Sequence, residues 1–180
     1  MIASGSDLLR VQKQHLASLL EAIQRCGYFL NVSDSGLSWP LTGEYLSANK
    51  KDNDLFEALA AINERFSKLQ DTLGSAMRHS LQLSGEQANS FIQILAIFEK
   101  NGVLLSIADW QVTRAARNLA AHDYQTDYDQ VAMHFNTLHG LKTELLHTAG
   151  RFIQYCENEL GTEPTTADFA SEFANIIMSK

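Results

Sequence analysis

The sequence has little of what breaks helices, cross-links chains or spans membranes. Only two of its 180 residues are proline, which leaves room for long helices. Its two cysteines, Cys26 and Cys156, lie far apart and form no C-x-x-C pair, so we expect both to be reduced. No stretch approaches the roughly 18–20 apolar residues of a membrane span, and the first residues lack the pattern of a secretory signal. These absences predict a cytoplasmic protein with no membrane contact.

The chain also lacks any run of basic residues. Its 14 lysines and arginines stand against 21 aspartates and glutamates, and the formal net charge is −7. A protein that binds duplex nucleic acid without regard to sequence usually carries a basic stripe. Any contact with nucleic acid must therefore be local, made by a few arginines in a cleft. Hydrophobic residues make up 45% of the chain, enough for a globular core.

What the chain does have is apolar residues at helical spacing along most of its length. The pattern predicts helices at about 7–30, 52–83, 84–100, 106–122 and 127–160, with a short last helix from 165 or 166. Residues 31–50 read as an irregular connector that packs on the helices, and no strand pattern occurs. We predict an all-α fold, an antiparallel helical bundle with a four- to five-helix core and an extra N-terminal helical arm. Residues 1–50 form the N-terminal helix and connector and residues 51–180 the bundle, packed together as one domain.

Capping patterns suggest where three of these helices begin. Ser84 followed by Gln87 resembles a capping box and predicts a helix start at 84. Ser106, with an acidic residue three positions later, predicts the start of the next helix. Thr126 or Asp127 can cap the long helix that follows.

The helix at 106–122 carries the residues best suited to chemistry. A helical wheel places Val112, Ala115, Ala116 and Leu119 on one side. It places Arg114, Arg117, Asn118 and His122 on the other side. Trp110 shares that side and is the best candidate for stacking a base, but packing is the expected role of the aromatic residues near the motif. An arginine fork matches a phosphate group, and a histidine can transfer a proton near neutral pH. The alternative is an ordinary solvated helix end or C-cap.

The stretch Arg114-Ala-Ala-Arg117-Asn118-Leu-Ala-Ala-His122-Asp-Tyr124 resembles the R-x4-H-x-Y signature of HEPN proteins. It is most similar to HepT-type toxins that are paired with small nucleotidyltransferases. The preceding FEKNGVLLSIADW is similar to the segment before the motif in that family. The resemblance covers roughly residues 84–160 and is weak over residues 1–83. It implies a helical bundle that forms a homodimer with the two motifs facing one cleft, and cleavage of RNA without a metal or other cofactor.

The resemblance also implies a role for each residue of the motif. His122 is the acid and base for attack of a ribose 2′-hydroxyl on the adjacent phosphodiester. Arg117 holds the phosphate, Asn118 supports the geometry, and Arg114 is a second phosphate contact. Tyr124 matches the tyrosine that the partner nucleotidyltransferase modifies with AMP, which blocks RNA by bulk and charge. The chain departs from the family's pattern in its N-terminal arm and in its lack of an obvious basic groove.

Other functions remain open at this point. The chain could be a non-catalytic binding partner of a nucleotidyltransferase, or a structural helical dimer in which the motif is a surface accident. His134, His139 and His147 share one helix, but their spacing does not match the i, i+4 pair of a zinc helix, so we expect no metal site there.

Overall fold

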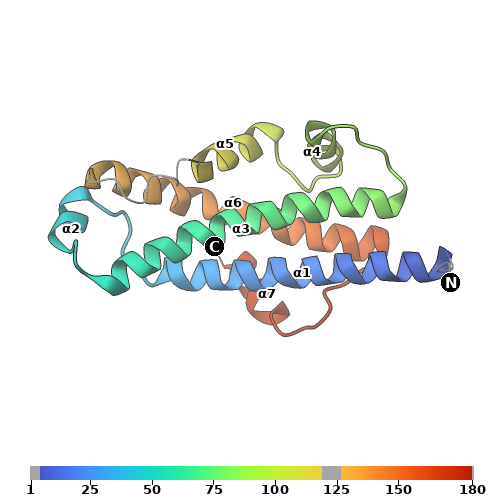
Figure 1. Cartoon of the computed structure of the whole chain (residues 1–180), viewed down its shortest axis with the longest axis horizontal. Coiled ribbons are helices and arrows are strands. Elements are labelled where there is room, and N and C mark those ends of the chain that lie inside the picture. Colours follow the sequence, from blue (N-terminus) through green and yellow to red (C-terminus); the bar gives the residue numbers. More distant parts are fainter. Residues whose placement is uncertain (1–4, 119–126, 180) are drawn as a thin grey trace.

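Three long helices form the body of the protein. The structure, a computed structural model, describes residues 5–118 and 127–179. The long helices lie side by side, and α1 runs antiparallel to the other two (Figure 1): α1 (Gly5–Ser35), α3 (Asn53–Ser84) and α6 (Tyr128–Leu160). Four shorter helices complete the described part: α2 (Gly43–Ala48), α4 (Phe91–Lys100), α5 (Ile107–Asn118) and α7 (Ala170–Met178). No strand occurs in these ranges, and the prediction of an all-α fold is confirmed. None of the described helices combines the length and apolar character needed to cross a membrane.

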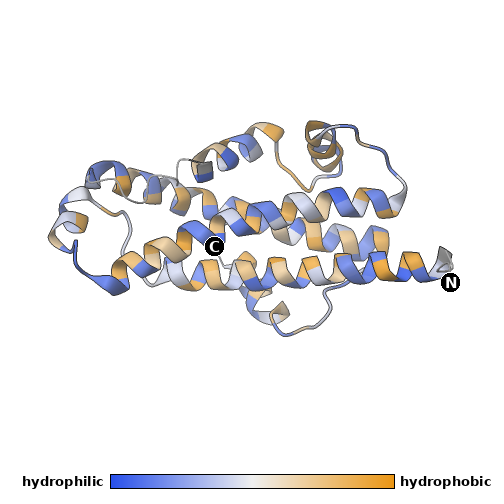
Figure 2. Ribbon diagram, in the orientation of Figure 1, coloured by the Kyte–Doolittle hydropathy of each residue, from blue (hydrophilic) through white to orange (hydrophobic). Residues whose placement is uncertain are grey.

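One continuous core joins the three long helices. It extends from Leu16 on α1 to Phe173 on α7, and Phe66, Phe98 and Phe152 are its largest fully buried side chains. Phe98 of α4 meets Phe152 of α6 edge to face, with ring centroids 5.5 Å apart. Hydrophobic and hydrophilic residues alternate along the long helices, as one buried face requires (Figure 2). Because α1 shares this core, it is a helix of the bundle and not an arm attached to it.

The short helices cover opposite sides of the bundle. α4 and α5 lie over α3, whereas α7 lies on the other side, against α1 and α6 (Figure 1). α7 fits closely because Gly27 leaves space for it: a Cβ at Gly27 would lie 2.6 Å from the Phe173 ring. The prediction that the first helix ends near residue 30 is wrong, since α1 continues to Ser35. Gly27 is a packing position inside the helix and not a sign of its end.

The connector after α1 packs on α6, as expected. Trp39 stacks on His139 with ring centroids 4.3 Å apart, and its indole nitrogen donates to the backbone oxygen of Asp34 over 2.8 Å. The side-chain amide of Asn136 both accepts from and donates to the backbone of Leu41, at 2.8 and 2.9 Å. Within the predicted connector, however, residues 43–48 form α2.

The structure corrects two predicted helix boundaries. Ser84 is the last residue of α3 and does not begin a helix, because Gly85 follows in the left-handed conformation (φ 76°) that ends helices. α4 begins at Phe91, where Ser90 accepts from the backbone N–H of Gln93. The last helix begins at Ala170 and not at 165 or 166. The predicted cap Asp127 is confirmed: its carboxylate accepts from two backbone N–H groups at the start of α6.

Candidate anion-binding site

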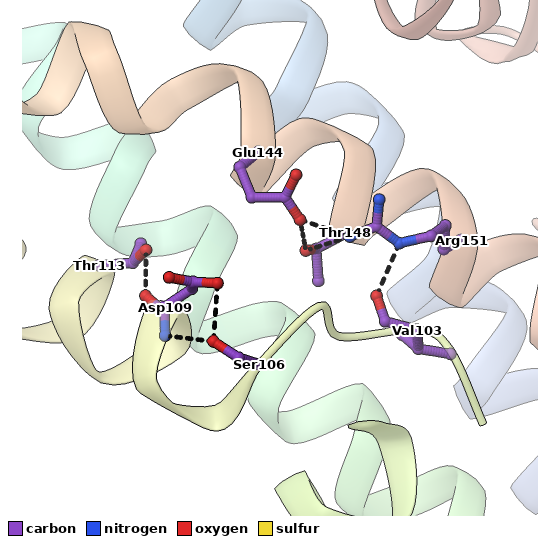
Figure 3. Close-up of polar contacts among 7 residues, drawn as sticks. All are labelled: Val103, Ser106, Asp109, Thr113, Glu144, Thr148 and Arg151. Carbon is purple, nitrogen blue, oxygen red and sulfur yellow. Dashed lines mark hydrogen bonds and ion pairs between the residues drawn. The ribbon is translucent and has the colours of Figure 1, made fainter. Parts of the chain in front are cut away.

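The start of α5 is capped by Ser106 (Figure 3). The Ser106 hydroxyl accepts from the backbone N–H of Asp109 at 3.0 Å and donates to its carboxylate at 2.7 Å. One turn later, the Thr113 hydroxyl donates to the backbone oxygen of Asp109 at 2.9 Å. This confirms the helix start predicted at Ser106, and the predicted end at residue 122 lies outside the described residues.

Arg151 of α6 holds the loop that leads into α5. Its Nε donates to the backbone oxygen of Val103 at 2.8 Å (Figure 3). The other end of its guanidinium pairs with Glu144 and donates to Thr148 at 3.1 Å. The guanidinium of Arg151 therefore holds the loop before α5 against α6, and this contact fixes where α5 begins.

The face that α5 buries is not the apolar side of the helical wheel. Trp110 is 5% exposed, and Thr113 and Ala116 are buried with it. Of the apolar side, Ala116 is buried, whereas Val112 is 54% exposed and Ala115 is also exposed. The reason is the indole ring: an aromatic side chain buries about 150–250 Å², far more apolar surface than a valine offers. Burial of Trp110 therefore sets the rotation of α5 about its own axis, and the indole packs as part of the core.

A hollow of about 250 Å³ lies where α5 meets α3 and α4. We call it the arginine hollow, because it collects side chains of three arginines. Its lining is Gln70, Asp71, Gly74, Ser75 and Arg78 of α3, Phe91 of α4, and Trp110, Arg114 and Arg117 of α5. Ligand pockets for drug-sized molecules measure roughly 300–1,000 Å³, so this space suits a phosphate group with part of a sugar or base.

Two of the three arginines belong to the predicted motif. Arg117 forms an ion pair with Asp71 of α3, and its side chain is 21% exposed. Arg114, one turn before it, is exposed and lines the same hollow. Both guanidinium groups stay charged at any physiological pH. Among the described residues, the lining therefore carries a formal surplus of two positive charges, three arginines against one aspartate.

The third arginine lies on α3 beside two aromatic rings. Arg78 places its guanidinium carbon 5.7 Å from the centroid of the Phe91 ring, within the range of a cation–π contact. Phe91 in turn lies 6.3 Å from Trp110, centroid to centroid. Both rings approach Gly74, where a Cβ would lie 3.2 Å from Phe91 Cζ and 3.9 Å from Trp110 Cζ2. The hollow thus combines guanidinium groups with aromatic walls.

The structure brings part of the predicted site together and leaves part of it undescribed. Arg114 and Arg117 line one hollow. The side chain of Asn118 and the whole of His122 and Tyr124 lie outside the described residues. Trp110, the best of the stacking candidates, packs in the core as expected of the aromatic residues near the motif and forms an inner wall.

Sequence reasoning missed the residues of α3 that face the motif, Asp71 and Arg78. One signal for them was present. Gly74 in the middle of a long helix costs about 1 kcal/mol relative to alanine, and such a glycine often marks a close approach of another element.

No group of histidine, cysteine, aspartate and glutamate side chains able to hold a metal ion occurs among the described residues. Of the three histidines on α6, His139 contacts the carboxylate of the buried Asp34, with 2.8 Å between Nδ1 and Oδ1. Lys142 pairs with the same carboxylate and donates to Asn31 at 3.1 Å. This cluster is tied to the end of α1 and serves its packing on α6.

Comparison with known proteins returned nothing: no family model, no curated protein and no solved structure matches this chain.

Proposed function

We propose that this chain is a HEPN-type, metal-independent endoribonuclease that binds an RNA phosphate in the arginine hollow. The observation that carries the proposal is the convergence of Arg114 and Arg117, both in the motif, with Arg78 on one small hollow. In a chain with a net charge of −7, such a local surplus of positive charge favours an anionic ligand. Arginine is the side chain best matched to phosphate geometry.

The proposed chemistry assigns one task to each residue of the motif. Arg117 and Arg114 hold the phosphate and stabilise the negative charge that develops on it. His122 removes the proton from the ribose 2′-hydroxyl as that oxygen attacks phosphorus, and a proton returns to the departing 5′ oxygen. The products are one RNA end with a 2′,3′-cyclic phosphate and one with a 5′-hydroxyl. Asn118 supports the geometry of this step.

The test is cleavage of labelled RNA in the presence of EDTA by the purified chain. We expect wild-type protein to cut, and His122→Ala and Arg117→Gln to lose at least about a hundredfold in rate, the usual size of an acid–base or electrostatic contribution. Arg25→Gln, which removes an exposed arginine of α1 away from the hollow, is the matched control and should cut at the wild-type rate. Equal cleavage by folded His122→Ala and wild type would refute the proposal.

By the same resemblance, the partners proposed for the chain are a second copy of itself and a small nucleotidyltransferase. Modification of Tyr124 with AMP by that enzyme is the proposed means of neutralisation, because a nucleotide there adds bulk and negative charge next to the motif. Mass spectrometry of the chain co-expressed with a nucleotidyltransferase encoded beside it tests this. We expect one added AMP on the wild-type chain and none on Tyr124→Phe. AMP at another residue, or none, would contradict the proposed site.

A further inference from the structure

The two partners of the ion pair between Asp71 and Arg117 differ in their exposure to solvent. The Asp71 side chain is 62% exposed, whereas the Arg117 side chain is 21% exposed and lines the arginine hollow. Because the carboxylate stays largely hydrated, pairing with it gives little stability, about 0–1 kcal/mol for exposed pairs. An anion that also contacts the other arginines of the hollow can therefore replace Asp71 at small cost.

The hollow offers such an anion more than Arg117 alone. Arg114 on α5 and Arg78 on α3 complete a set of three guanidinium groups around it. Arg78 lies over Phe91, which limits where its side chain can go and so lowers the entropy lost on binding. Among the described lining residues, one carboxylate faces three guanidinium groups. A group with two negative charges matches them better.

Gln70 supplies a second indication of a ligand. The residue is 2% exposed and lines the hollow, and its side-chain nitrogen donates to the backbone oxygen of Trp110 at 3.3 Å. Its side-chain oxygen, however, is buried and accepts no hydrogen bond from any residue that the structure describes. Leaving a buried acceptor unsatisfied costs about 1–3 kcal/mol. A hydroxyl group next to a phosphate, as on a ribose, is the kind of donor that would satisfy it.

We propose that Asp71 occupies the phosphate position on Arg117, and that phosphate carrying two negative charges replaces it and contacts Arg117, Arg114 and Arg78. Asp71 is then a competing internal anion that sets the affinity of the site. Two parts of an RNA chain carry this charge: two consecutive phosphodiesters, one of which is the bond to be cut, or a terminal phosphate monoester, which would bind the chain end without being cut. The inference rests on the proposed function for the identity of the ligand as RNA, whereas the exchange itself rests on the hollow.

Calorimetric titration with inorganic pyrophosphate tests the exchange without any cleavage. We expect Asp71→Asn, which keeps the shape and removes the charge, to bind about tenfold tighter than wild type, and Arg78→Gln about tenfold weaker, each a change of about 1.4 kcal/mol. Glu57→Gln removes one charge from an exposed position elsewhere on α3 and is the matched control, expected within about twofold of wild type. Thermal unfolding of each variant confirms that it is folded.

The opposite result for Asp71→Asn identifies the competing explanation. If Asp71 serves to position Arg117, Asp71→Asn binds more weakly than wild type or equally well, and the exchange is refuted. Failure of both wild type and Asp71→Asn to bind pyrophosphate also refutes it, whatever the cleavage assay shows. Tighter binding by Asp71→Asn in a chain that does not cut RNA leaves the anion site standing and removes only the ribonuclease.

Binding of two DNA oligonucleotides, which have no 2′-hydroxyl to react, distinguishes a terminal phosphate from consecutive phosphodiesters as the ligand. One oligonucleotide carries a 5′-phosphate and the other a 5′-hydroxyl. If the hollow takes a chain end, Asp71→Asn tightens binding of the phosphorylated form alone. If it takes consecutive phosphodiesters, the substitution tightens binding of both forms equally. Tighter binding of neither form would contradict the inference for nucleic acid.

Discussion

Gly74 of α3 and Phe91 of α4 approach so closely that a Cβ at position 74 would lie 3.2 Å from the ring carbon Cζ. Both residues line the arginine hollow. The missing side chain at position 74 therefore keeps the space open and lets the ring form its wall.

Filling that space should weaken ligand binding. Gly74→Leu places a branched side chain against Phe91 and Trp110 or into the hollow, and we expect affinity for pyrophosphate to fall at least about tenfold. Gly140→Leu is the matched control, since a Cβ there meets nothing within 4 Å and Gly140 also lies inside a long helix. Both variants gain about 1 kcal/mol of helix propensity. Unchanged binding by Gly74→Leu would show that the hollow is not the site.

The position of α5 should depend on Arg151. Arg151→Met keeps most of the apolar stem and removes the donor to Val103 and the partner of Glu144. Loss of these contacts should cost about 1–3 kcal/mol. Hydrogen exchange followed by mass spectrometry should show faster exchange in residues 103–113, with α1 unchanged. Protection equal to that of wild type across this segment would mean that the loop is held by other contacts.

The packing of the connector and α6 against the end of α1 should depend on Asp34. Its carboxylate is buried and pairs with Lys142, whose side chain is itself mostly buried. Asp34→Ala leaves that ammonium group without its partner, so we expect the free energy of unfolding in urea to fall by about 3–5 kcal/mol. Glu57→Ala, at an exposed position, should change it by less than about 0.5 kcal/mol. A loss below 1 kcal/mol for Asp34→Ala would show that water readily replaces the pair.

The two free cysteines should make stability fall at alkaline pH. Burial raises the pKa of Cys26 to about 11 and that of Cys156 to about 12, from an ordinary value of 9.0. Between these values the folded chain keeps thiol protons that the unfolded chain has lost. Deprotonation therefore favours unfolding, and the contribution of the thiols is complete below pH 9 and is lost as pH rises toward 11 and 12.

Comparing wild type with the double variant Cys26→Ala/Cys156→Ala isolates this effect from other groups that titrate in the range. The decline in unfolding free energy between pH 8 and pH 10.5 should be smaller in the variant. Parallel declines would show that the thiols are accessible and have ordinary pKa values in the folded chain.

Local chemistry made several helix boundaries predictable. Ser106 and Asp127 cap helices because their side chains satisfy backbone N–H groups within three residues, which the sequence displays directly. The same reasoning wrongly predicted a helix start at Ser84, because a serine three residues before a glutamine resembles a cap even where a helix ends. Gly85 decided the outcome, because it takes the left-handed conformation that ends α3.

The candidate site was only half predictable, because three helices that are separate in the sequence make it. The spacing of Arg114 and Arg117 is visible in the sequence and correctly puts them on one hollow. Asp71 and Arg78 lie about forty residues earlier, on a helix whose apolar stripe gives no hint of which polar positions meet α5. That pairing follows from the buried indole of Trp110, which sets how α5 turns against α3. A helical wheel gives valine and tryptophan equal weight. It therefore does not predict which side of α5 packs against α3.

Ultraviolet cross-linking of a short single-stranded RNA to the chain, with the cross-linked residues mapped by mass spectrometry, tests whether RNA binds in the arginine hollow. We expect cross-links at residues of the hollow, above all at Phe91, Trp110 and their neighbours on α3 and α5, and their loss in Arg114→Gln/Arg117→Gln. Cross-links on another face of the bundle that persist in that double variant would contradict this expectation.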